Sequence, residues 1–205
     1  MSQIKILIVE DEVLIARDIA RTLKGIDYEV TGIAYDGQSA LKELKAYLPD
    51  LAILDINLGG EPDGIAVAKY IQDTLDIPFI FLTSYASEMI IDKAKRTRPM
   101  GYIVKPFSEK DLFSAIEIAL YNYSQLVHPL KFDMERINKQ LTSPLSVKEY
   151  EIVCDIYEGR TNQQLTGKHF ISMNTVKTHI RHIYEKLHVD SRSEAIVRLR
   201  TILSL

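Results

Sequence analysis

The sequence predicts two domains of different class, an α/β domain built on a five-stranded parallel sheet and, after it, a small all-helical domain. Through residue 125, short apolar runs rich in β-branched residues alternate with segments of helical period. Beyond residue 144 the chain changes to short segments with clear helix start and stop signals. The charge changes as well. Residues 1–125 hold 13 Lys and Arg against 19 Asp and Glu, a net −6, whereas residues 141–205 hold 9 against 7, a net +2.

Five apolar runs are the predicted strands of the first domain, and each is followed by a predicted helix. Most of these runs are nearly continuous in apolar residues, which is typical of strands covered on both faces. Repeated strand–helix units favour a parallel sheet with helices on both sides. The predicted strands are 6–9, 30–35, 51–55, 79–83 and 101–104, and the predicted helices are 13–24, 39–47, 64–75, 88–95 and 109–123.

Polar residues stand where the predicted strands end. Glu10 and Asp11 follow the first strand, Asp55 ends the third, Thr83 ends the fourth and Lys105 follows the fifth. Ligands of open parallel sheets bind at the carboxyl ends of the strands, so we expect these side chains to meet at one edge. Clustered carboxylates need a compensating cation, and Mg2+ prefers one or two carboxylates together with phosphate oxygens. The edge is therefore predicted to carry out metal-assisted phosphoryl transfer.

Residues 3–125 resemble the receiver domain of response regulators, which implies a flavodoxin-like (βα)5 fold. The resemblance rests on the acidic pair after the first strand, on LDIN around Asp55, on LTSYA around Thr83 and on GYIVKPF around Lys105. It implies that Asp55 is the nucleophile that takes a phosphoryl group from a sensor histidine kinase. The stretch NLGGEPDG after Asp55 departs from the usual pattern, which has a proline four residues after the acceptor, so the loop beside the site is expected to differ.

The same resemblance implies roles for the residues around the acceptor. The implied Mg2+ ligands are the carboxylates of Asp11 and Asp55 and the backbone carbonyl of Asn57, with Glu10 in a supporting role. Lys105 would pair with the phosphoryl oxygens, and its bond to Pro106 would be cis. Thr83 would hydrogen-bond the same oxygens and, with Tyr102, report phosphorylation to the far face of the domain.

Ordinary structural roles compete with each of these assignments when the residues are taken one at a time. An acidic pair after a strand often serves as helix N-terminal charge, and an aspartate at a strand end can cap a turn. A magnesium phosphatase that turns over small phosphate esters is a further alternative. No second general acid or base is apparent at the predicted edge, so we expect a response regulator that is not an enzyme beyond its own phosphorylation and dephosphorylation.

Residues 126–143 are predicted to form a linker between domains 1–125 and 144–205. His128–Pro129 and Ser143–Pro144 argue against an uninterrupted helix, because the residue before a proline is pushed out of the α region. A short helix between the two prolines is compatible with this. Four short helices are expected beyond the linker, and Gly159 is placed to end the first. Their predicted caps are Ser146 with Glu149 as a capping box, Asn162, Ser172, and Ser191 with Glu194 as a second capping box.

The third of these helices, which begins after Ser172, has two contrasting faces. The apolar stripe consists of Val176, Ile180, Ile183 and Leu187. The opposite side offers cations and short polar side chains without an acid: Asn174, Lys177, Thr178 and Arg181. Such a face suits the major groove of DNA. A solvated surface is the alternative, but the arrangement of a capped short helix, a tight turn and this polar helix favours DNA binding.

Residues 144–203 resemble the helix-turn-helix domain of NarL/LuxR-class transcription factors. The residues that carry the resemblance are LSVKEYEIV, EGRTNQQL, ISMNTVKTHIRHIYEKL and VDSRSEAI. It implies a recognition helix over Thr175 to Arg181 that reads double-stranded operator DNA, with Lys186 at a phosphate. The final helix would help to form a homodimer through Ala195, Ile196, Leu199 and Ile202, and the helices of the receiver are the alternative dimer surface. A rival hypothesis is that these helices bind a protein partner instead of DNA.

Together these features predict a two-component transcription regulator whose DNA binding and dimerisation respond to phosphorylation of Asp55. Only one cysteine, Cys154, is present, which excludes an internal disulfide and a thiolate zinc site. No apolar run is long enough to span a bilayer, and no secretory signal pattern begins the chain. A cytoplasmic protein without membrane contact is therefore expected.

Overall fold

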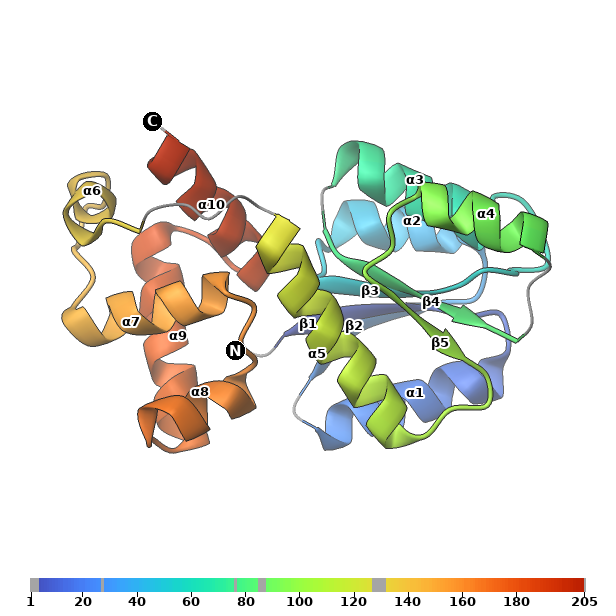
Figure 1. Ribbon diagram of the computed structural model, residues 1–205, viewed down its shortest axis with the longest axis horizontal. Coiled ribbons are helices and arrows are strands. Elements are labelled where there is room, and N and C mark those ends of the chain that lie inside the picture. The colour runs from blue at the N-terminus through green and yellow to red at the C-terminus, as the bar shows by residue number, and fades with distance from the viewer. Residues whose placement is uncertain (1–3, 27, 76, 85–87, 127–131, 205) are drawn as a thin grey trace. The chain divides into compact units, whose positions relative to one another are not determined.

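The computed structural model describes residues 4–26, 28–75, 77–84, 88–126 and 132–204 (Figure 1). The chain divides into two compact units, one covering Ile4–Leu120 and the other beginning at Tyr121. The division falls within the long helix α5 (Glu109–Leu126). Within the described part of the chain, no helix has both the length and the apolar character needed to cross a membrane.

Five parallel strands form a single sheet in the N-terminal unit. They are β1 (Lys5–Val9), β2 (Glu29–Ala34), β3 (Leu51–Asp55), β4 (Phe79–Thr83) and β5 (Gly101–Val104). Their order is β2-β1-β3-β4-β5, the flavodoxin-like order in which the chain direction across the sheet reverses beside β1 and β3. The predicted fold class is confirmed, and every predicted strand lies within one residue of the observed one.

Helices cover both faces of the sheet (Figure 1). α1 (Val13–Gly25) and α5 pack on one face, and α2 (Gly37–Ala46), α3 (Gly64–Thr74) and α4 (Glu88–Arg96) pack on the other. Successive residues of β1 point to opposite faces, so Ile6 and Ile8 enter one core whereas Leu7 and Val9 enter the other. Two buried faces explain the nearly continuous apolar runs of the strands.

The C-terminal unit is helical around one apolar core. Its helices are α6 (Met134–Lys139), α7 (Val147–Tyr157), α8 (Asn162–His169), α9 (Met173–Leu187) and α10 (Arg192–Ser204). α6 lies inside the range predicted as linker, where the short helix allowed by the sequence does form. Asp133 caps it, and Ile137 is completely buried in the core of the helical unit. This part of the linker range therefore packs as part of the helical unit.

The start signals of α7 and α9 are confirmed. The Ser146 side chain accepts a hydrogen bond from the Glu149 backbone N–H, and the Glu149 carboxylate accepts one from the Ser146 N–H, which completes the capping box. Ser172 accepts from the Thr175 N–H at 3.1 Å. Gly159 lies just after α7 with φ of 81°, a backbone conformation that favours glycine.

The other two predicted caps differ in detail. Asn162 is not the cap of α8, because Thr161 has the extended backbone of a cap and forms a reciprocal capping box with Gln164. The Ser191 hydroxyl does accept from the Glu194 N–H, at 3.2 Å. The Glu194 carboxylate, however, accepts from the Asp190 N–H at 2.8 Å, one residue earlier than the capping-box spacing predicts.

The four apolar residues of α10 that were expected at a dimer surface are buried within their own unit. Ala195, Ile196, Leu199 and Ile202 are each at most 5% exposed and belong to the core of their own unit. Packing of α10 against the other helices of the same chain already uses this face. A dimer in which these four residues contact a second chain would require the unit to open.

Candidate functional site

The predicted acidic and basic residues come together at the carboxyl edge of the sheet. Val9 pairs with Leu54 and Asp55 pairs with Leu82 in the parallel register, so neighbouring strands end side by side. The residues that follow or end these strands therefore emerge at one edge, close to the point between β1 and β3 where ligands bind in folds of this order. Glu10, Asp11, Asp55, Thr83 and Lys105 are all at this edge.

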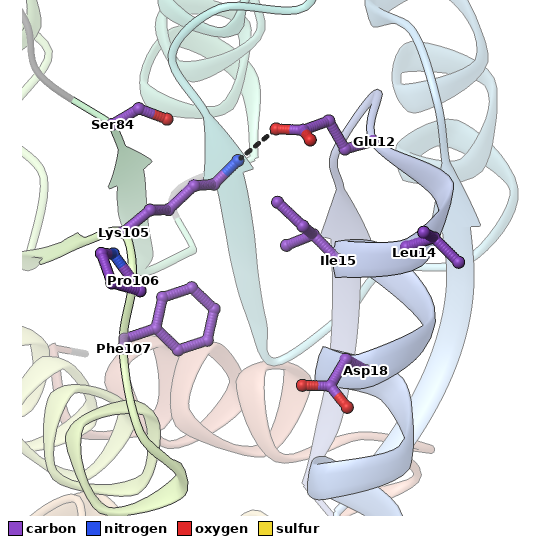
Figure 2. A pocket seen from close by; sticks show the side chains of 8 residues that line it. All are labelled: Glu12, Leu14, Ile15, Asp18, Ser84, Lys105, Pro106 and Phe107. Atoms are coloured by element: carbon purple, nitrogen blue, oxygen red, sulfur yellow. Dashed lines mark ion pairs between the residues drawn. The ribbon is translucent and has the colours of Figure 1, made fainter.

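Lys105 connects the acids of this edge. Its Nζ lies 2.8 Å from Glu10 Oε1 and 2.5 Å from Asp55 Oδ2, and only 8% of its side chain is exposed. A longer contact of 3.8 Å joins it to Glu12, drawn as the dashed line in Figure 2. Burial alone would lower the pKa of Lys105, but the hydrogen bonds to Asp55 and Glu10 outweigh this and raise it. The side chain is therefore a fixed ammonium group between two carboxylates.

Glu10 is the most deeply buried acid of the site, with no exposed surface. Its burial raises the pKa to about 7, and the nearby charge of Asp55 acts in the same direction. The hydrogen bond from Lys105 opposes this rise. Glu10 is thus a fully buried acid beside Asp55 and Lys105, and its supporting role at a metal stays a prediction.

Three carboxylates of the site are arranged in a way that suits a hard cation. Glu10, Asp11 and Asp55 each offer one oxygen, and these oxygens lie within 4.8 Å of one another. Asp11 is exposed and Asp55 is 5% exposed. The Asp55 Oδ1 accepts a hydrogen bond from the Asn57 N–H at 2.8 Å, which fixes the carboxylate. An all-oxygen set with solvent access on one side matches the preference of Mg2+.

Thr83 carries a polar atom without a partner. Its Oγ1 is buried, and within the described part of the chain no group makes a hydrogen bond to it. A buried hydroxyl in this state is unfavourable, so its retention needs an explanation. The hydroxyl stands on the last residue of β4, at the same edge as Asp55 and Lys105. A phosphoryl oxygen on Asp55 is the kind of acceptor that it lacks.

The segments around the acceptor are held close by backbone contacts. A Cβ added to Gly64, the first residue of α3, would lie 1.8 Å from the carbonyl oxygen of Asp55, so only glycine fits there. Asp63 caps α3 by accepting from the Ala66 N–H at 2.7 Å. This accounts for the DG pair in the unusual loop after Asp55, a contact that the strand pattern did not reveal. The Lys105–Pro106 bond is cis, as the resemblance implied, and Glu61–Pro62 is cis as well.

Tyr102, the predicted reporter residue, lies on β5 and is 40% exposed. Its ring packs against Phe81 of β4 with 5.9 Å between centroids. The ring is therefore half-buried beside the strand that ends at Thr83. This position is compatible with the predicted role, although packing alone would also explain it.

A cavity of about 490 Å3 opens beside the Lys105 side chain. Its walls come from the beginning of α1 and from the segment after β5, and Figure 2 shows Ile15 and Phe107 facing each other across it. Glu12, Ser84 and Lys105 add polar groups at one end. The cavity thus gives access to the acceptor edge from the side of α1.

The helical unit presents the predicted polar face of α9. The apolar stripe is buried as expected, with Val176, Ile180, Ile183 and Leu187 at 1% exposure or less. On the opposite side, Lys177 is half-buried, and four further residues are exposed: Asn174, Thr175, Thr178 and Arg181. The Arg181 guanidinium makes one loose exposed pair with Glu185, at 3.8 Å.

Lys186, which was predicted to contact a DNA phosphate, has partners within its own unit, and the phosphate contact stays a prediction. Its Nζ lies 2.7 Å from Glu149 Oε2 and 2.9 Å from the carbonyl oxygen of Pro144. Burial would raise the pKa of Glu149, but the hydrogen bonds from Lys186 and from the Ser146 backbone outweigh it and lower the pKa. The ammonium group therefore joins α9 to the start of α7, which the sequence spacing did not indicate.

An ion network that was not predicted fixes α7 against α8. Asp155 is 2% exposed, and its carboxylate contacts His169 at 2.8 Å, Lys168 at 2.5 Å and Arg160 at 3.1 Å. Buried Arg192 at the start of α10 donates to the carbonyl oxygens of Ile156 and Arg160, both at 2.7 Å. These contacts hold the helices that precede α9 in a defined position. In the sequence, only the Ser191–Arg192 pair within the VDSRSEAI motif pointed to this arginine, and it did not indicate burial.

Comparison with known proteins gives similarity over both units. The family described as response regulator receiver domain matches residues 6–117, and the family described as bacterial regulatory proteins, luxR family, matches residues 143–199. The transcriptional regulatory protein PdtaR of Mycobacterium tuberculosis is 37% identical over 122 residues, which are 60% of this chain and 59% of that relative.

Two further similarities extend the comparison. The transcriptional regulatory protein LiaR of Bacillus subtilis is 30% identical over 204 residues, covering 95% of both chains. Among solved structures, the signal receiver domain of a modulated diguanylate cyclase from Desulfovibrio desulfuricans has a TM-score of 0.58 and 32% identity, and the match covers 61% of this chain and 99% of that domain.

Proposed function

The chain belongs to the response regulators that join a receiver domain to a LuxR-family DNA-binding domain, and from this premise we propose that phosphorylation of Asp55 controls how it binds DNA. Its relatives include transcriptional regulators that match over almost the whole chain. The roles of Asp55, of the metal ligands and of the DNA contacts are part of this proposal, and the positions of these residues support them. The observation that carries the proposal is the arrangement of Asp55 beside the ammonium of Lys105 and the Thr83 hydroxyl, which makes no hydrogen bond to a residue that the structure describes.

Asp55 is placed to act as the nucleophile toward a phosphohistidine on a sensor kinase. One carboxylate oxygen forms the new O–P bond, the N–P bond breaks, and its electron pair returns to the imidazole nitrogen. The hydrogen bond from the Asn57 N–H holds the carboxylate in one orientation for attack. Lys105 then pairs with the phosphoryl oxygens, and Thr83 donates its hydroxyl to one of them.

Mg2+ fits the acids of the site, because they supply only oxygen atoms and lie close together. The Asp11 and Asp55 carboxylates and the Asn57 backbone carbonyl would hold it, with Glu10 in support. When bound, the ion neutralises negative charge on the phosphoryl group during transfer. The single positive charge of Lys105, which pairs with Glu10 and Asp55, cannot balance the negative charge of three acids and a phosphoryl group.

The cavity beside Lys105 provides the approach for the phosphohistidine. It reaches the acceptor edge between α1 and the segment after β5. Leu14 at the start of α1 is 82% exposed and lies at its rim, where an apolar helix of the kinase could pack.

We propose that the receiver performs no reaction other than its own phosphorylation and dephosphorylation.

The exposed face of α9 is proposed to enter the major groove of operator DNA. Lys177 and Arg181 can reach guanine O6 and N7, and Thr178 and Asn174 can reach other base edges. Lys186, whose ammonium also pairs with Glu149, is proposed to contact a phosphate beside the groove. Phosphorylation is proposed to change dimerisation and DNA affinity with a coupling of about 1–3 kcal/mol, the usual range for such switches.

The test is native mass spectrometry of the full chain incubated with a small phosphoramidate, with and without Mg2+. The wild type should gain a single phosphoryl adduct that depends on Mg2+, and Asp55→Asn should gain none. Asp63→Asn is the matched control, because asparagine can replace the aspartate as the cap of α3 and the residue lies in the same loop. An adduct on Asp55→Asn, or none on the wild type with a competent donor, would contradict the acceptor assignment.

The control of DNA binding is tested with the same protein samples in fluorescence anisotropy titrations with promoter duplexes. Phosphorylated wild type should bind with an affinity 5- to 150-fold different from the unphosphorylated protein, as the coupling implies. Identical affinities in the two states would exclude control of DNA binding by Asp55. Dimer formation is read from the same mass spectra.

A further inference from the structure

We propose that Phe170, in the turn between α8 and α9, is a DNA-contacting residue whose ring packs on an apolar group of the duplex, a thymine methyl or a deoxyribose. The inference rests on the proposed DNA binding of α9 and adds a residue that the polar-face pattern does not include. It concerns an apolar contact, whereas the predicted contacts of α9 are polar or charged. Three observations support it, from solvent exposure, backbone conformation and position.

The first observation is the exposure of the ring. Phe170 is 93% exposed, more than any other large hydrophobic residue in the described part of the chain. The next residue, Ile171, packs against the core of the helical unit. The backbone of the turn is fixed as well, because the N–H groups of Phe170 and Ile171 both donate to the Thr166 carbonyl. The fold therefore orders the turn and leaves the ring in water.

The second observation is the backbone conformation. Phe170 ends α8 with φ of 54° and ψ of 41°, the left-handed region that usually holds glycine or asparagine at this position of a helix. A phenylalanine here is less favourable for the fold than either of those residues. Its side chain also gains almost no burial in return. A residue that lowers the stability of the free protein without gaining burial is best explained by a contact made with a ligand.

The third observation is the position relative to the proposed recognition helix. Phe170 precedes the Ser172 cap by two residues, which places their Cα atoms within about 8 Å. In helix-turn-helix proteins the N-terminal residues of the recognition helix contact base edges while the preceding helix crosses the backbone. The turn that joins them therefore lies at the edge of the groove. Aromatic rings are known to contact the thymine methyl there.

The test compares Phe170→Asn with the wild type on a duplex selected by the full-length wild type from a random library. Asparagine tolerates the left-handed backbone but lacks the ring. His188→Asn is the matched control, because His188 is also exposed, ends a helix in the left-handed region with φ of 56°, and lies at the far end of α9. Affinities are measured by anisotropy over a range of salt concentrations, and thermal unfolding is recorded for all three proteins.

The expected result is a loss of affinity of about tenfold for Phe170→Asn, from the apolar area no longer buried on binding. Its dependence of log affinity on log salt should stay unchanged, because no phosphate contact is removed. Its melting temperature should be equal to or above that of the wild type, and His188→Asn should bind like the wild type. Phe170→Tyr, which keeps the ring, should retain most of the affinity.

Replacing thymines by uracils in the selected duplex distinguishes the two apolar groups. If removal of one thymine methyl lowers the affinity of the wild type but not that of Phe170→Asn, the ring contacts that methyl. No such position, together with the tenfold loss, identifies the sugar. If Phe170→Asn and the wild type bind the duplex equally well, the inference about Phe170 is overturned while the proposed DNA binding of α9 stands. An equal loss of affinity in His188→Asn has the same meaning. Failure of the wild type to select any duplex overturns the proposed function of α9 together with it.

Discussion

Replacing Thr83 by valine should stabilise the unphosphorylated receiver and weaken its response to phosphorylation. The two side chains have nearly the same shape, but valine lacks the hydroxyl. In the wild type that hydroxyl is buried and makes no hydrogen bond to any described residue. The substitution therefore removes an unfavourable buried group without leaving a cavity.

The size of the effect follows from the cost of an unpaired buried hydroxyl, which is about 1–3 kcal/mol. Taking the lower end, because Thr83 itself is only half-buried, we expect the free energy of unfolding to rise by about 1 kcal/mol. For a unit of this length that corresponds to an increase in melting temperature of about 4 °C. Valine is also a good strand former at this position in β4.

Thr97→Val provides the matched control within the same unit. Thr97 is 5% exposed, and its hydroxyl donates to the Ala94 carbonyl at 2.7 Å. The same chemical change there removes a satisfied hydrogen bond and should lower the free energy of unfolding by about 1 kcal/mol. The two substitutions are thus expected to act with opposite sign.

Differential scanning calorimetry of the full chain measures both variants before and after treatment with a phosphoramidate and Mg2+. Phosphorylation should raise the melting temperature of the receiver less in Thr83→Val than in the wild type, because the hydroxyl that would bind the phosphoryl group is gone. A destabilised Thr83→Val would refute the reasoning, since it would mean that the hydroxyl already has a partner in the unphosphorylated protein. An equal gain on phosphorylation would refute the role of Thr83 at the site.

Three other predictions concern the DNA-binding face, acid stability and the buried ammonium. Lys177→Ala combined with Arg181→Ala should weaken site-specific DNA affinity by tenfold or more in anisotropy titrations, with the phosphoryl adduct intact; unchanged affinity would contradict the assignment of the recognition helix. Lys186 and Ser146 lower the pKa of Glu149 in the folded state. The contribution of this carboxylate to stability is therefore complete above its ordinary pKa of 4.5 and is lost as the pH falls through the lowered pKa. In urea unfolding, the free energy of unfolding of Glu149→Gln should accordingly fall less below pH 4.5 than that of the wild type. Lys105→Met should lower the free energy of unfolding at pH 7 by about 3 kcal/mol in urea titrations, because it removes the cation that two buried carboxylates share. A loss below about 1 kcal/mol would contradict this, since it would mean that the carboxylates do not depend on Lys105 for charge compensation.

Much of the receiver site follows from local sequence. Apolar runs determine where the strands lie, and the polar residue after each run must then stand at the carboxyl edge of a parallel sheet. Glu10, Asp55, Thr83 and Lys105 meet there for this reason. The same logic predicted the buried stripe of α9, because helical period alone decides which side chains share a face.

Other features depend on contacts between residues that are distant in the chain, and local patterns do not encode them. Lys186 binds Glu149 from 37 positions away, so a cation predicted as a phosphate contact also joins two helices of the fold. The apolar face of α10 is covered by its own unit, so the four residues expected at a dimer surface are core residues.

The sequence by itself determined the fold class, the order of the elements and the set of chemical groups at the carboxyl edge, because each depends on periodicity and on the ends of single segments. Only the tertiary structure decided which of those groups are paired. It showed that Lys105 is bound to two acids, that the Thr83 hydroxyl has no partner among the described residues and that the Phe170 ring is left in solvent. Pairing and burial depend on which segments pack together, and that information exists only once the chain has folded.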